Sequence, residues 1–217
     1  RGIALSLNAQ IGLLRAAGND AAAVGAEQMC LMLTRQIAAR GEPGDRNNLS
    51  RLLNLLADHQ TNAADALAMA NESVGIMYDL LEDAPSRLAL QYDLIVALTV
   101  RARVHDRADA LAERRQDVIT AFIVAENLHE RAGAQESSDA LRSTLRNLVE
   151  ATAQMGDLVR ARPLIARLAT MYPAGSRSRA AIERNLVEVD QQIVATHGKD
   201  LDVGAIPLQH AAAEVMR

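Results

Sequence analysis

This chain of 217 residues contains no tryptophan, one phenylalanine, three tyrosines and one cysteine. Aromatic residues are enriched in β-strands, so their scarcity argues against a β-sandwich or barrel. A single cysteine, Cys30, forms neither an intramolecular disulfide framework nor a cysteine-based zinc site. No apolar run approaches the roughly 18 residues needed to span a membrane. We therefore expect neither a disulfide-stabilised domain nor a membrane protein.

Lysine is nearly absent as well. Of the 23 basic residues, 22 are arginine, a bias that suggests a GC-rich genome. The 27 acidic residues give a net charge of −4, which argues against a general nucleic-acid-binding protein. The composition is typical of a cytoplasmic protein. The start at Arg1 rather than Met is consistent with removal of a signal peptide or another domain.

Alanine and leucine dominate instead, with 41 and 29 copies. Both favour helices. Over 67–81, 111–129 and 182–193, apolar residues recur at steps of three and four, as on one face of a helix. No comparable stretch alternates with period two, so we predict an all-α protein. In the first stretch the apolar face comprises Leu67, Ala70, Val74, Met77, Tyr78 and Leu81.

Glycine and proline divide the chain into four helix pairs and one further helix. The turn Gly41-Glu42-Pro43-Gly44, for example, separates the first two pairs. We predict one helical domain over 1–198 and a tail over 199–217 that either folds back or serves as a linker. The predicted helices are 2–17 and 20–40, 46–60 and 63–83, 86–105 and 107–132, 136–155 and 158–171, then 177–196, with a short helix over 208–216 in the tail.

The joints within the pairs share a pattern in which Asn or Asp stands four residues before Ala. Asn or Asp at this place caps the incoming helix by accepting its free N–H groups, and the small Ala allows close approach of the two helices. The joints are Asn19 with Ala23, Asn62 with Ala66, Asp106 with Ala110 and Asp157 with Ala161. The alanines lie 43, 44 and 51 residues apart, a period typical of an α-solenoid.

This joint, a small residue in the second helix and a proline after the pair resemble tetratricopeptide repeats. The segments 47–50, 66–68, 72–74 and 81–85 resemble the longer variety, of about 42–44 residues, in kinesin light chains and bacterial STAND-type signalling ATPases. The resemblance covers about 45–173, although the usual tryptophan is missing. It implies a right-handed α-solenoid of about four antiparallel helix pairs, in which the helix at 177–196 is the C-terminal cap.

In tetratricopeptide arrays the first helix of each pair lines a concave groove. Because arginine captures carboxylates in a bidentate manner, the resemblance implies that an acidic segment or a free C-terminus binds there. We expect the partner-binding residues to be Arg51, His59, Tyr92, Arg103, Arg146 and Gln154.

Charge is unevenly distributed along the chain. Residues 52–86 contain six acids and no Arg or Lys, whereas 142–184 contain eight arginines and three acids. One interpretation is that both stretches are solvated faces. The other is that the two stretches attract each other between copies of the chain, or bind a neighbouring domain, and so form a homo-oligomer or a complex.

The search for catalytic motifs is largely negative. The chain has no phosphate-binding loop, dinucleotide fingerprint or zinc-protease motif, so we expect no cofactor. Glu126 and His129 match the Glu-x-x-His spacing of di-iron bundles, but no second such motif exists, so we expect no metal site. Cys30 stands in an apolar helical run, where we expect an inert thiol.

These observations favour a non-enzymatic scaffold or sensor module of a larger bacterial signalling protein, which binds a protein or peptide. A second hypothesis is a small-molecule-sensing domain that controls oligomerisation, and a pocket lined by Tyr78 or Tyr92 with several arginines would favour it. The third is a helical-bundle metalloenzyme that uses Glu126 and His129.

Overall fold

The computed structural model describes residues 11, 13–14, 16–132 and 135–197. Every regular element within these ranges is a helix, so the all-α prediction is confirmed. No helix in the same ranges is long and apolar enough to cross a membrane. The helices are α2 (Asp20–Ala38), α3 (Pro43–His59), α4 (Ala63–Asp83), α5 (Leu88–Arg107), α6 (Leu111–Ala132), α7 (Gln135–Gln154), α8 (Leu158–Thr170) and α9 (Arg177–His197).

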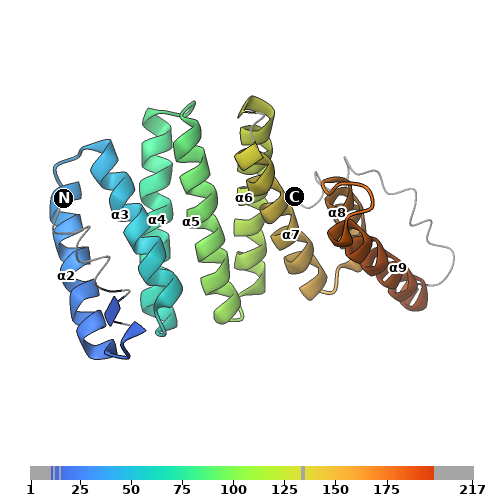
Figure 1. Ribbon diagram of the computed structural model, residues 1–217, viewed down its shortest axis with the longest axis horizontal. Coiled ribbons are helices and arrows are strands. Elements are labelled where there is room, and N and C mark those ends of the chain that lie inside the picture. Colours follow the sequence, from blue (N-terminus) through green and yellow to red (C-terminus); the bar gives the residue numbers. More distant parts are fainter. Residues whose placement is uncertain (1–10, 12, 15, 133–134, 198–217) are drawn as a thin grey trace. The chain divides into compact units, whose positions relative to one another are not determined.

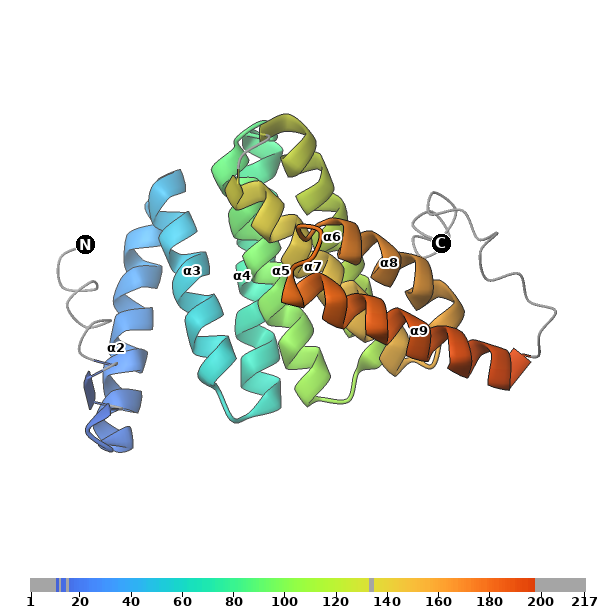
Figure 2. The ribbon, with the colours of Figure 1, turned by 45° about the vertical axis from the view of Figure 1, so that its right-hand side comes forward.

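The chain divides into two compact units, Arg1–Ala108 and Asp109–Arg217. In the first unit α2 packs against α3, α3 against α4 and α4 against α5, and α3 also contacts α5 (Figure 1). In the second unit the same succession runs from α6 to α9 (Figures 1 and 2). Consecutive helices are therefore neighbours in space within each unit. The predicted tail 199–217 lies outside the described residues, as does the predicted helix 2–17 apart from four helical positions.

Several predicted helix boundaries differ from the observed ones by one to four residues. Pro43 and Gly44 belong to α3 rather than to the preceding turn, because proline is favoured at the first position of a helix. The helix α5 continues to Arg107, so Asp106 lies in its last turn and does not cap the next helix. The chain turns instead at Asp109, which adopts the left-handed conformation with φ 55°.

The other three predicted caps are confirmed. The side chain of Asn62 accepts hydrogen bonds from the N–H groups of Ala64 and Asp65, at 2.9 and 3.2 Å. Asn19 caps α2 and Asp157 caps α8 in the same way, each through one N–H group. These bonds satisfy N–H groups that have no partner within their own helix.

The position four residues after each cap faces the neighbouring helix. Alanine occupies it in α2, α4 and α8, and Ala23, Ala66 and Ala161 are all buried. In α6, which begins at Leu111, the corresponding residue is Arg114 rather than Ala110, and Arg114 is also buried. The four positions are 43, 48 and 47 residues apart, a more even spacing than the one predicted from the alanines alone.

Small and branched residues form the core between the helices. In the first unit Ala57, Ala66 and Ala70 pack with two valines of α5. Alanine at a helix contact lets the backbones approach closely, which explains how a core forms with so few aromatic residues. The predicted apolar face of α4 is buried at Val74 and Met77, whereas Tyr78 of the same face is 47% exposed.

Candidate functional site

The six predicted partner-binding residues are all exposed and fall in both units. Arg51 and His59 lie on α3, and Tyr92 and Arg103 lie on α5, in the first unit. The remaining two, Arg146 and Gln154, lie on α7 in the second unit. The predicted residues therefore form two sets, one in each unit.

Arg51 contacts a buried carboxylate of its own unit. Its Nε and Nη2 atoms donate to the two oxygens of Asp93, at 3.1 and 2.9 Å, and Asn47 donates to the same carboxylate at 2.9 Å. Asp93 is only 7% exposed, whereas the Arg51 side chain is 60% exposed. The guanidinium therefore neutralises a charge that burial would otherwise destabilise.

Arg103 also bridges α3 and α5. Its Nε atom donates to Asp58 at 3.0 Å, and the neighbouring Arg107 donates to the carbonyls of Ala57 and Asp58, at 2.8 and 2.6 Å. These carbonyls belong to the last turn of α3, where they have no helical N–H partner. The arginines of this face thus stabilise the contact between the two helices.

The second set lies on a groove between α7, α8 and α9, with a volume of about 680 Å³. Its floor is apolar and comes from all three helices, whereas its rim is polar. Arg146 and Gln154 both line it, together with Tyr172 from the turn before α9. The apolar lining residues are Val149, Ala153, Leu158, Ile165, Leu168, Ile182 and Val189.

At one end of this groove two arginines surround Tyr172. The Nη2 atom of Arg146 donates to the Tyr172 hydroxyl at 2.6 Å, and the guanidinium of Arg142 lies over the tyrosine ring at 5.0 Å. Arg142 pairs with Asp139 at 3.0 Å, but no described carboxylate pairs with Arg146. Arg146 is therefore a cation open to an external partner. Tyr172 was not among the predicted site residues, because a tyrosine before a proline at a helix end is typical of a turn.

Toward the other end, the groove is lined by amide groups and by one acid that has an arginine partner. Gln154 accepts a hydrogen bond from buried Arg114, and Arg114 also pairs with Glu150 at 3.2 Å. The charge of Glu150 is thereby balanced. Gln154 and Gln192 present amide groups there. Arg114 was also missed, since the expected residue at its position was alanine.

A second groove, of about 650 Å³, lies in the first unit between α2, α3 and α4. Its lining includes His59, Asp65 and an ion pair between Arg35 and Glu72. The Nδ1 atom of His59 lies 2.8 Å from the carbonyl of Leu55 in its own helix. Neither Tyr78 nor Tyr92 lines this groove or the one in the second unit.

Glu126 and His129, which were considered as catalytic residues, contact side chains of neighbouring helices. Glu126 pairs with Arg167, and the Nδ1 atom of His129 lies 3.3 Å from the hydroxyls of Ser137 and Ser138. Among the described residues no group of three or more His, Cys, Asp or Glu side chains is placed to hold a metal ion.

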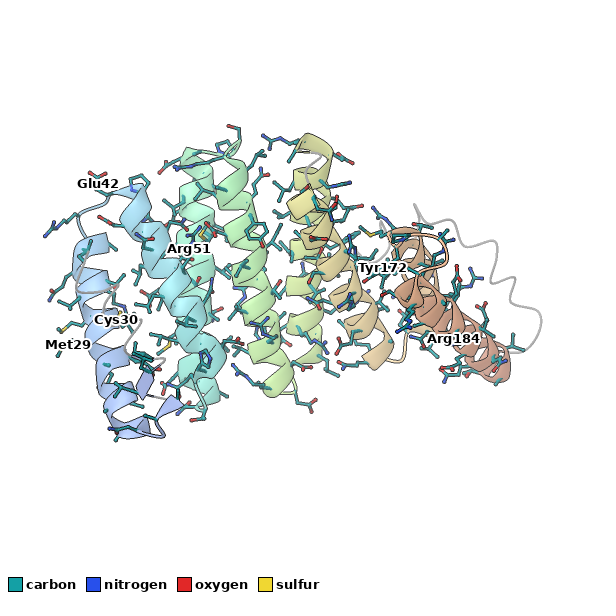
Figure 3. All side chains as sticks on the ribbon, viewed as in Figure 1. Met29, Cys30, Glu42, Arg51, Tyr172 and Arg184 are labelled. Atoms are coloured by element: carbon teal, nitrogen blue, oxygen red, sulfur yellow. The ribbon has the colours of Figure 1, made fainter. Side chains whose placement is uncertain are left out.

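Cys30 is 1% exposed and packs against Leu52 and Leu56, on the opposite side of α2 from the exposed Met29 (Figure 3). Burial raises the pKa of the Cys30 thiol, and a hydrogen bond with Thr34 opposes this effect. A thiol that is buried and protonated reacts poorly as a nucleophile.

Many charged residues of the two stretches 52–86 and 142–184 form ion pairs within their own unit. Of the six acids over 52–86, Asp58, Glu72 and Asp79 form ion pairs with arginines of other helices. Of the eight arginines over 142–184, five pair with carboxylates. The partners of each stretch lie in its own unit, so neither stretch is a purely solvated face.

Comparison with known proteins does not identify a family: no protein-family model matches the chain, and no curated protein matches its sequence. The geometry of the two units therefore carries the functional argument. The resemblance to tetratricopeptide repeats stays an interpretation of the repeated joints.

Proposed function

We propose that this protein is a non-enzymatic protein-interaction module, and that the groove between α7, α8 and α9 binds a segment of a partner protein. The observation that carries the proposal is Arg146: it lines the apolar groove and, within the described residues, has no carboxylate partner. An apolar floor with a polar rim is the usual form of a groove that binds peptides or helices.

We further propose that the helices form antiparallel pairs of tetratricopeptide-like repeats in a right-handed α-solenoid, with α9 as its cap. Two observations support this arrangement. The positions after the helix starts recur at 43, 48 and 47 residues. Ion pairs also join alternate helices within a unit: α2 to α4, α3 to α5 and α6 to α8. Contacts between equivalent helices of successive repeats are expected in a solenoid.

A selection from a library of displayed helical peptides tests the function. The purified full chain is the target, and the variant Asn185→Trp, which fills the groove from an exposed position of α9, is the counter-target. We expect enriched peptides that bind the native chain and bind the variant at least about tenfold more weakly. Failure to enrich any peptide that distinguishes the two proteins would overturn the proposal.

A further inference from the structure

The groove of the second unit has a length and a lining suited to a helix. Its residues on α9 run from Ser178 to Gln192, which corresponds to about 20 Å of helix at about 1.5 Å per residue. A partner helix of about 14 residues would match this length. Because the floor is apolar and the rim polar, the matching helix has one apolar stripe and one polar face.

The two ends of the groove differ in charge. The end at Tyr172 and Ser178 carries Arg146, whose charge has no described carboxylate partner, and Arg142 lies over the same tyrosine. The opposite end presents Gln154 and Gln192. Among the described residues that line the groove, Glu150 is the only acid, and it is paired with Arg114. The arginine without a described carboxylate partner therefore lies at one end of the groove, and amide groups lie at the other.

A helix bound in this groove has a preferred direction. The C-terminal end of a helix carries a partial negative charge from its free carbonyl groups, and carboxylate side chains there add to it. Such an end is attracted to Arg146, whereas an N-terminal end without carboxylates would be repelled. Building on the proposed function, we infer that the partner is an amphipathic helix of another protein whose carboxylate-bearing C-terminal end lies at Arg146 and Tyr172.

Two synthetic peptides test this inference. They share one apolar stripe, one composition and one net charge, with blocked termini, but one has its two glutamates in the last turn and the other in the first turn. Fluorescence anisotropy measures binding of each labelled peptide to the full chain. We expect the peptide with C-terminal glutamates to bind about fivefold more tightly than the other.

Matched variants locate the effect. Arg146→Gln should abolish the preference between the peptides, while Arg184→Gln should preserve it, because Arg184 is an exposed arginine on α9 that does not line the groove (Figure 3). Asn185→Trp should weaken both peptides at least about tenfold. Circular dichroism of each variant checks that its helices are intact.

The outcomes separate the inference from the function on which it rests. Equal binding of the two peptides, both weakened by Asn185→Trp, would overturn the direction but leave the groove as a binding site. Binding of neither peptide would overturn the inference but not the proposed function, which the peptide selection tests independently. A photo-reactive residue at position 192 that cross-links to residues 198–217 or to a second copy would overturn the assignment to another protein.

Discussion

At the scale of single residues, burial decides what each charged side chain does. Arg51 was predicted to bind a partner because arginine suits carboxylates, and the carboxylate that it contacts is Asp93 of its own unit. The residue types were therefore informative, but the pairing was not predictable, since the two residues lie 42 positions apart on different helices. Arg146 has the same chemistry and differs only in lacking such a partner among the described residues.

The ion pair of Asp93 predicts a measurable loss of stability. Asp93→Asn removes a buried carboxylate that accepts three hydrogen bonds, and we expect the free energy of unfolding to fall by about 1–3 kcal/mol. Urea denaturation followed by circular dichroism measures it. The control Glu82→Gln, at an exposed acid with no described partner, should change stability by less than about 0.5 kcal/mol. Equal losses in the two variants would show that the Asp93 contacts contribute nothing.

Because the Cys30 thiol is buried, we expect the stability of the protein to depend on pH. Because burial raises its pKa in the folded state, the unfolded chain loses the thiol proton first as the pH rises. Stability should therefore decrease above about pH 8.5, the ordinary thiol pKa, and Cys30→Ala should remove this part of the decrease. Thermal melts of both proteins between pH 7 and 10 test the prediction. Identical pH profiles would contradict a buried, protonated thiol.

At the scale of the elements, the sequence predicts a helix start well where a side chain caps the helix. Its prediction of the start is wrong where no side chain does so. Asn62 and Asp157 were assigned correctly, because the amide or carboxylate of the cap acts within three residues. Asp106 was not, because α5 continues past it and the turn depends on the left-handed conformation of Asp109. Local chemistry is visible in sequence, whereas the end of a helix set by packing is not.

The cap of α4 is testable on its own. Asn62→Ala removes the acceptor of two hydrogen bonds from N–H groups, and we expect it to destabilise the protein by about 1 kcal/mol. Asn62→Asp keeps the acceptor and should cost less than half as much. A shift of the urea midpoint that is the same for both variants would contradict capping as the cause.

Arg114 gives a second prediction at the scale of the helices. It occupies a position that holds alanine in three other helices, and it contacts Gln154 and Glu150 across to α7. We expect Arg114→Ala to cost about 2 kcal/mol, because it removes both the packing of the side chain and the ion pair. Arg177→Ala, at an exposed arginine without a described partner, is the control and should be nearly neutral. Equal urea midpoints for the two variants would mean that the contacts between Arg114 and α7 do not stabilise the protein.

At the scale of the whole molecule, the sequence shows that charge is unevenly distributed. It does not show whether the charged stretches are solvated or bind each other between copies of the chain. Five of the eight arginines over 142–184 and three of the six acids over 52–86 pair within their own unit. Three of these pairs are local, between residues three or four positions apart. The other five depend on which helices are neighbours, and the sequence does not show that. Such pairs leave fewer charges for contacts between copies.

Self-association through these stretches is therefore expected to be weak. Light scattering after size exclusion should give the mass of a monomer at both low and high salt, because surface charges that are already paired attract a second copy little. A dimer at low salt that dissociates at high salt would show that the acidic and basic stretches bind each other between chains.

The central claim is that the groove between α7, α8 and α9 binds a partner helix, and one titration tests it most directly. Labelled amphipathic peptide with C-terminal glutamates is titrated with the native chain and with Asn185→Trp, and anisotropy is recorded. We predict saturable binding to the native chain that weakens at least about tenfold in the variant. Equal affinity for both proteins would place any binding outside the groove and contradict the claim.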